Sequence, residues 1–162
     1  MLKNVLLIPC FLLLGAFPAF GQTAAIFGGY QFSHLDGGTT LNGWNASVTG
    51  GVAPFLGITG DFSGVYKSGS KLHTYSFGPE VRAHVAKVRP FAHALFGGYT
   101  SSGPISQGTI NGFAMFYGGG LDIKASPVIS LRPGQFDWMV VHRSGLTDKN
   151  NFRYSAGLVL SF

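Results

Sequence analysis

Apolar and polar side chains alternate along most of the chain, from about residue 26 to residue 162. In the first alternating segment, Ile26 and Tyr30 fall on one face while Gln31 and Ser33 fall on the other. A period of two is that of a β-strand with one apolar face. The pattern predicts an all-β chain of eight strands, at about residues 26–33, 44–52, 56–66, 74–85, 90–99, 113–123, 128–141 and 152–162.

The seventh segment contains one phase slip. Leu131 and Phe136 fall on the same face only if one extra residue is accommodated between them, at Pro133-Gly134. A β-bulge shifts the side chains by one position and tolerates the missing proline donor. We therefore predict a bulge at this dipeptide.

The connections between segments differ in length. The second, fourth and sixth are short and marked by Pro54, Pro90 and Pro127. The first, third, fifth and seventh are polar and expected to be longer, at residues 36–40, 67–71, 100–111 and 142–150. Segments of about 9 to 13 residues are long enough for a tilted strand to cross a bilayer, and loops of unequal length are typical of outer-membrane barrels. The prediction is an eight-stranded antiparallel up-and-down transmembrane β-barrel.

Residues 1–21 have the features of a secretory signal peptide. Lys3 supplies a positive start, Val5 to Phe17 form the apolar region, and residues 19–21 form a cleavage site before Gln22. Cys10 lies within the apolar region, so the mature barrel domain, residues 22–162, contains no cysteine. Disulfides and thiol catalysis are therefore not expected.

The composition favours a membrane protein without a spanning helix. Charged residues make up 10% of the chain, well below the roughly 25% of an average soluble domain, whereas 25 residues are glycine. No segment after residue 21 is apolar for long enough to form a spanning helix. The formal charge is +5, but the basic residues are scattered, so a nucleic-acid partner is not expected.

The alternating faces differ in a way that indicates which one meets lipid. The polar face is mostly Gly, Ser, Thr and Ala, which form a poor solvent coat but fill the interior of a narrow barrel. We expect the large aromatics to face lipid near the membrane interfaces: Tyr30, Phe32, Trp44, Tyr66, Tyr75, Trp138, Tyr154 and Phe162. A soluble, lipocalin-like periplasmic carrier with an apolar interior is the alternative.

This orientation points several charged side chains into the lumen. The set contains four acidic and three basic residues: Asp61, Glu80, Arg82, Asp122, Arg132, Asp137 and Arg153. Charges in a low-dielectric interior must be paired or hydrated, so we expect a salt-bridge network that fills the barrel. A narrow path for ions or small solutes, gated by re-pairing of Glu80, is the functional alternative.

No catalytic site is apparent. The serines lack a nucleophile turn such as G-x-S-x-G, and the five histidines lack metal-ligand spacing. The phase of the fifth segment is ambiguous; we favour Ala92, Ala94 and Phe96 outward and His93 inward. We expect His84 to lie in the lumen and to meet His93 in a structural hydrogen bond.

Three stretches carry a family resemblance. They are the closing Tyr154-x-Ala156-x-Leu158-x-Leu160-x-Phe162, the seventh-segment residues 129–138, and Pro90-Phe91 with Leu95 to Gly98. These resemble the small outer-membrane β-barrel family that includes the OmpA membrane domain, OmpX and OmpW-like proteins. The resemblance implies insertion by the outer-membrane assembly machinery, with Tyr154, Leu158, Leu160 and Phe162 as the assembly signal. No peptidoglycan-binding domain follows, so cell-wall tethering is not expected.

Together these features predict a monomeric protein of the bacterial outer membrane, exported through a cleaved signal peptide. We expect a structural or surface-interaction role, with a passive channel and a soluble carrier as alternatives, and no enzymatic activity. The expected partners are the outer-membrane lipid bilayer, the assembly machinery and periplasmic chaperones. We expect no metal and no cofactor.

Overall fold

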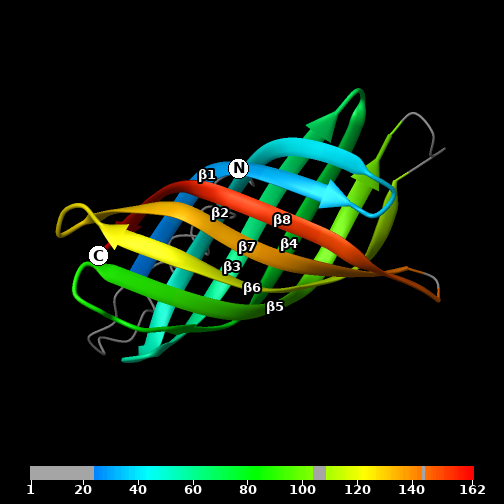
Figure 1. Ribbon diagram of the computed structural model, residues 1–162. Coiled ribbons are helices and arrows are strands. Elements are labelled where there is room, and N and C mark those ends of the chain that lie inside the picture. The colour runs from blue at the N-terminus through cyan, green and yellow to red at the C-terminus, as the bar shows by residue number, and fades with distance from the viewer. Residues whose placement is uncertain (1–23, 104–108, 144) are drawn as a thin grey trace, which may run out of the picture.

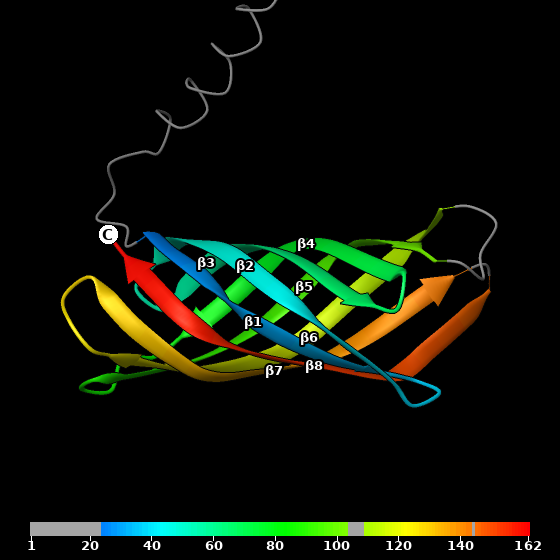
Figure 2. The same ribbon diagram turned by 90° about the horizontal axis from the view of Figure 1, so that it is seen from above.

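The computed structural model describes residues 24–103, 109–143 and 145–162. Eight antiparallel strands form one closed barrel in chain order, with β1 paired to β8 (Figures 1 and 2). The strands are β1 (Ala24–Leu35), β2 (Thr39–Ala53), β3 (Leu56–Lys67), β4 (Ser70–Arg82), β5 (Val88–Ser102), β6 (Ile110–Lys124), β7 (Ile129–Arg143) and β8 (Leu146–Ser161). The predicted fold class is confirmed. The expected signal peptide, residues 1–21, lies outside the described residues.

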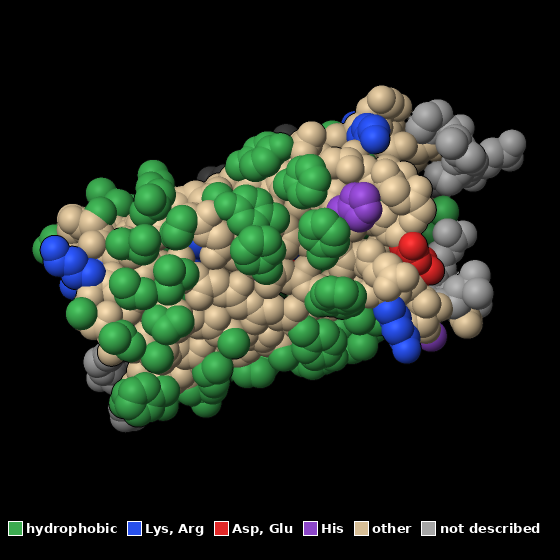
Figure 3. All heavy atoms as spheres, viewed as in Figure 1, with side chains coloured by type: hydrophobic (Ala, Val, Ile, Leu, Met, Phe, Trp, Pro, Cys, Tyr) green, Lys and Arg blue, Asp and Glu red, His purple; other side chains and the backbone are tan. Residues whose placement is uncertain are grey.

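The period of two separates the two faces of the barrel wall. On β3, Ile58 is 57% exposed while the next residue, Thr59, is 2% exposed. Outward side chains are apolar around the barrel, and Figure 3 shows hydrophobic side chains spread over the visible side. The fifth strand has the phase that we favoured, with His93 buried and Phe96 exposed. An apolar exterior is the reverse of what a soluble lipocalin-like carrier requires, so that alternative is not supported.

The predicted bulge on the seventh strand is confirmed. The pairing of β7 with β8 shifts register between Arg132 and Gln135, which brackets Pro133-Gly134. As a result Arg132 and Gln135 are both buried, although an odd number of positions separates them. The bulge therefore directs both polar side chains into the lumen.

The two ends of the barrel hold different connections between strands. We call the end that holds the β1–β2, β3–β4, β5–β6 and β7–β8 connections the loop end. The opposite end, which we call the terminal end, holds the other three connections and brings Ala24 beside Phe162, whose N–H donates to the Ala24 carbonyl at 2.8 Å. Figure 2 shows the start of β1 next to the C-terminus.

Three of the expected long loops are instead tight hairpins. Strand pairing continues to Leu35–Thr39, Lys67–Ser70 and Arg143–Leu146, so the predicted alternation of loop length was wrong. In the β3–β4 hairpin, Ser68 and Gly69 have positive φ angles, which allow a two-residue reversal. The expected loop at residues 100–111 shortens too, because β5 runs to Ser102 and β6 starts at Ile110.

Polar residues at the loop end therefore lie on strands rather than in loops. The strands contain 12 to 16 residues, whereas a tilted strand needs about 9 to 11 residues to cross a bilayer. The excess carries polar residues such as Thr39, Lys71 and Lys149, which extend the barrel wall past its apolar belt. Within the described residues, no helix is long and apolar enough to cross a membrane.

The predicted interface aromatics Tyr30, Trp44, Tyr66, Tyr75 and Trp138 are all exposed on the outer face. All five lie in the half of the barrel nearer the loop end, where Trp44 Nε1 donates to the Tyr66 hydroxyl at 3.3 Å. They form one girdle. At the terminal end the exposed residues are mainly aliphatic, such as Ile58, Val81 and Leu158.

Close strand approach requires glycine at several inward positions, of which Gly43 is one. A Cβ on Gly43 would lie 1.9 Å from the Gly64 carbonyl oxygen, whereas a Cβ on the lipid-facing Gly28 would meet nothing within 4 Å. We expect Gly43→Ala to lower the free energy of unfolding by about 1–3 kcal/mol, because the backbone must move. Gly28→Ala, the matched control, should change it by less than about 0.5 kcal/mol. Urea titration of the barrel in lipid vesicles measures both, and equal effects would contradict the close approach.

Candidate functional site: a charged lumen beneath an apolar cup

Arg153 on β8 lies at the centre of the lumen and is 1% exposed. Its Nη1 donates to Asp61 Oδ1 at 2.6 Å, and its Nε donates to Asp137 Oδ2 at 2.7 Å. Asn45 on β2 donates to the other oxygen of Asp61 at 2.9 Å. One guanidinium therefore links carboxylates from β3 and β7 across the barrel, which is how a buried charge is compensated.

Arg132 on β7 forms the second centre. It contacts both oxygens of Asp122, with Nε at 2.6 Å and Nη2 at 3.0 Å. Its Nη1 donates to Gln135 Oε1 at 2.7 Å, and Gln135 Nε2 in turn donates to Asp137 Oδ2 at 2.8 Å. Gln135 therefore joins the Arg132 pair to the Arg153 pair in one continuous network.

Phenylalanine rings cover the buried guanidinium groups. The Arg132 carbon Cζ lies 4.5 Å from the ring centre of Phe27 and 4.1 Å from that of Phe91. Arg153 Cζ lies 4.5 Å from the ring centre of Phe116. Cation–π contact stabilises a cation that is removed from water. Our expectation that large aromatics lie on the lipid face was thus incomplete, since these three rings face inward.

Glu80 on β4 anchors the part of the network nearest the terminal end. Arg82 Nε donates to Glu80 Oε1 at 3.1 Å, and the Thr59 hydroxyl donates to Glu80 Oε2 at 3.0 Å. His93 on β5 lies between two carboxylates, with Nε2 at 2.8 Å from Asp137 Oδ1 and Nδ1 at 3.8 Å from Glu80 Oε2. His93 thereby connects the Glu80 pair to the rest of the network.

The expected contact between His84 and His93 was wrong. β4 ends at Arg82, and His84 lies beyond it as an exposed residue of the β4–β5 connection. Our prediction continued the alternation of inward and outward side chains two residues past the end of β4. The partners of His93 come instead from β4 and β7, on opposite sides of its own strand.

All seven predicted lumen residues lie inside the barrel, and each of them forms an ion pair. The lumen network consists of these seven residues together with His93 and Gln135. The sequence reasoning missed the roles of His93 and Gln135, although their inward parity was the signal that could have found them. A protonated His93 makes the acidic and basic members equal in number, four of each.

An apolar layer closes the lumen on the loop side of the network. It consists of Leu95, Tyr99, Ala114, Phe116 and Met139, all at most 7% exposed. The partly buried Leu35, Leu72 and Val141 pack against it. The interior therefore changes from charged to apolar toward the loop end.

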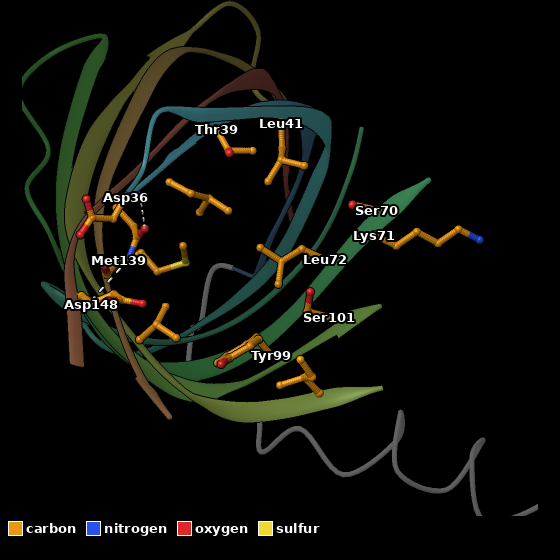
Figure 4. A pocket seen from close by; sticks show the side chains of 14 residues that line it. Asp36, Thr39, Leu41, Ser70, Lys71, Leu72, Tyr99, Ser101, Met139 and Asp148 are labelled. Carbon is orange, nitrogen blue, oxygen red and sulfur yellow. Dashed lines mark hydrogen bonds between the residues drawn. The ribbon is translucent and has the colours of Figure 1, made fainter. Parts of the chain in front are cut away.

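Above this layer, a cavity of about 330 Å³ opens at the loop end, which we call the loop-end cup. Leu41, Leu72 and Met139 point into it, while the Lys71 side chain extends away (Figure 4). The backbone N–H of Asp36 donates to Asn151 Oδ1 at 2.8 Å and fixes one side of the rim. The cup combines an apolar floor with a polar rim, which suits an apolar group that enters from the loop end.

The residues of the expected assembly signal lie on β8 or directly after it. Leu158, Leu160 and Phe162 are exposed on the outer face, and the Tyr154 hydroxyl donates to the Pro133 carbonyl at the bulge. Among the residues that the structure describes, no group of three or more His, Cys, Asp or Glu side chains is arranged to hold a metal ion.

Comparison with known proteins identifies the fold. The sequence matches no protein-family model and no curated protein. Among solved structures, Neisserial surface protein A is similar with a TM-score of 0.65 and 14% identity, over 88% of this chain and 98% of that one. The N-terminal β-barrel domain of Pseudomonas aeruginosa OprF gives a TM-score of 0.66 and 13% identity, over 87% of this chain and 97% of that one.

A third similar structure is Ail, the attachment invasion locus protein of Yersinia pestis, in complex with the heparin analogue sucrose octasulfate. Its TM-score is 0.54 at 16% identity, over 87% of this chain and 99% of that one. All three matches cover nearly the whole of the other chain. The chain thus has the fold of the small outer-membrane β-barrels, as its sequence resemblance implied.

The network predicts a large stability effect at its centre. We expect Arg153→Met to lower the free energy of unfolding in lipid vesicles by about 3–5 kcal/mol, because Asp61 and Asp137 lose their shared cation. The exposed Lys67 offers a control, and Lys67→Met should change stability by less than about 0.5 kcal/mol. Adding Asp61→Asn and Asp137→Asn to the Arg153 variant should recover part of the loss. A loss no larger than that of the control would show that the ion pairs are not needed.

Proposed function

We propose that this chain is an integral protein of the bacterial outer membrane with a structural or surface-interaction role, and that its barrel does not conduct. The observation that carries this proposal is the filled lumen. Paired charges occupy its middle, and the apolar layer closes it toward the loop end. A barrel closed in this way offers partners its lipid face and its two ends.

Export and location follow from the sequence and the fold together. The proposed route is cleavage after residue 21, passage through the periplasm with its chaperones, and insertion by the outer-membrane assembly machinery. The apolar outer face and the likeness to outer-membrane barrels support this location. On this topology the terminal end faces the periplasm and the loop end faces outward.

The loop-end cup is the surface that we propose for interaction. Its floor is formed by Leu41, Leu72 and Met139, and its rim carries Asp36 and Asp148. Such a site favours an apolar group attached to a polar body, because burial of apolar area drives binding while the rim remains hydrated. No chemical transformation is proposed there.

The closed lumen predicts that the barrel carries no ionic current. Single barrels in a planar bilayer should show no current above the bilayer background, and Glu80→Gln and Arg82→Gln should behave in the same way. Neutralising one member of a gate would change conductance, whereas neutralising one member of a closed network changes stability. Stepwise currents that respond to either substitution would instead support the channel alternative.

The terminal aromatic predicts an assembly defect. We expect deletion of Phe162 to abolish insertion and to lead to periplasmic degradation, whereas Phe77→Ala should insert normally. The control is matched, because Phe77 is 68% exposed and Phe162 is 67% exposed on the same outer face. Outer-membrane fractionation and heat-modifiable gel migration report insertion. Phe162→Ala removes the aromatic ring but retains the backbone hydrogen bond to Ala24. This variant therefore distinguishes the contribution of the side chain to insertion from that of the hydrogen bond. Normal insertion of the deletion variant would remove the proposed signal.

A further inference from the structure

The apolar layer beneath the loop-end cup includes a tyrosine, Tyr99 on β5. Its side chain is 7% exposed and packs in this layer with Leu95, Phe116 and Met139. Tyr99 also lines the cup, and Figure 4 shows its side chain inside the ring of strands. A phenylalanine would fill nearly the same space without carrying a hydroxyl into an apolar layer.

The Tyr99 hydroxyl has no hydrogen-bond partner among the residues that the structure describes. Opposite Tyr99 on β4 lies Thr74, whose hydroxyl is already bonded to that of Ser63 at 2.7 Å. Opposite Tyr99 on β6 lies Gly112, which has no side chain. A largely buried hydroxyl without a partner costs free energy. Its presence at the floor of a cavity therefore points to a partner that enters the cavity.

Packing holds the Tyr99 ring in place. A Cβ added at Gly112 would lie 2.6 Å from the Tyr99 hydroxyl oxygen, so the ring occupies space that a side chain at that position would fill. Phe116 and Met139 pack in the same layer. A hydroxyl that is already held in position loses little conformational freedom when it binds a ligand.

The rest of the cup limits the chemistry of the ligand. Its volume of about 330 Å³ is near the lower end of the range for small-molecule sites, about 300–1,000 Å³. Leu72 and Met139 point into it, so most of the ligand surface has to be apolar. The Lys71 side chain extends away from the cup, and the carboxylates of Asp36 and Asp148 on the rim disfavour an anion. These features favour a compact, neutral ligand.

We propose that the loop-end cup binds a compact neutral compound with an apolar body and one hydroxyl or carbonyl group, which forms a hydrogen bond with the Tyr99 hydroxyl. The proposal rests on the proposed function, which makes the cup the interaction surface of the barrel. A tyrosine hydroxyl can donate to either group and can also accept from a hydroxyl. A hydrocarbon of the same shape would fit but would leave Tyr99 unpaired.

Two methionines allow the cup to be followed by NMR. Residues 22–162 contain only Met115 and Met139. Met139 lies at the cup, whereas Met115 lies on the outer face, where its sulfur accepts a hydrogen bond from the Tyr117 hydroxyl at 3.3 Å. The barrel, labelled with carbon-13 in its methionine methyl groups, is placed in phosphatidylcholine nanodiscs. A compound bound in the cup shifts the Met139 signal to saturation, whereas a compound dissolved in the lipid shifts the Met115 signal without saturation.

The probes are 4-ethylphenol and ethylbenzene, which differ by one hydroxyl. We expect Tyr99→Phe to weaken the binding of 4-ethylphenol roughly fivefold, the effect of one hydrogen bond, and to change that of ethylbenzene by less than about twofold. The control variant Tyr75→Phe removes the same group from the outer face, where Tyr75 is 55% exposed, and should change neither. Heat-modifiable migration should be the same for all three barrels, because Tyr99→Phe removes no hydrogen bond within the described chain.

The possible failures are distinguishable. If both probes bind but Tyr99→Phe weakens them equally, or weakens neither, the hydroxyl does not recognise the ligand. That result would overturn this inference and leave the cup as an interaction surface. If neither probe gives a saturable shift of Met139 in the unaltered barrel, both this inference and the proposed role of the cup are wrong. A chain that does not enter the discs would overturn the proposed membrane location as well.

Discussion

The pairing of Arg153 with Asp61 and Asp137 is the interaction on which the interior of this barrel depends. An eight-stranded barrel encloses space for side chains but little for water, so any charge inside it must find an opposite charge nearby. Arg153 meets this requirement across the lumen, at 2.6 Å from Asp61 Oδ1 and 2.7 Å from Asp137 Oδ2. The contact fixes the relative positions of β3, β7 and β8, and the remaining pairs extend from it.

This arrangement also determines where function can reside. The network occupies the central lumen, and the apolar layer with Leu95 and Phe116 at 0% exposure seals it toward the loop end. Solute passage would have to separate buried ion pairs, which carries a large desolvation penalty. On the proposed function, the surfaces left for recognition are the apolar belt and the loop-end cup.

Most of the fold and part of the candidate site could be predicted from the sequence. Alternation alone separated Ile58 from Thr59 and identified all seven Asp, Glu and Arg residues of the network, because parity within a strand decides the side of the wall. The slip between Leu131 and Phe136 located the bulge for the same reason. Loop lengths could not be predicted from the alternation. Polar residues such as Lys71 and Lys149 look like loop residues in the sequence, but they belong to strands that extend past the apolar belt. The partners of His93 were not accessible either, because parity gives the side of the wall and leaves the distance across the lumen undetermined.

The same scarcity of charge connects the lipid face and the lumen. Of the six Asp and Glu side chains in the chain, four lie in the lumen network and two lie at the loop end. Placement on the belt would put a cation in hydrocarbon, which is costly near the bilayer midplane and nearly free at the interface. Lys87, Arg89 and Lys124 accordingly lie in or beside the connections at the terminal end, outside the belt. The chain thus keeps four of its six acidic side chains, and the arginines that pair with them, inside the lumen, where each charge is compensated by another part of the barrel wall.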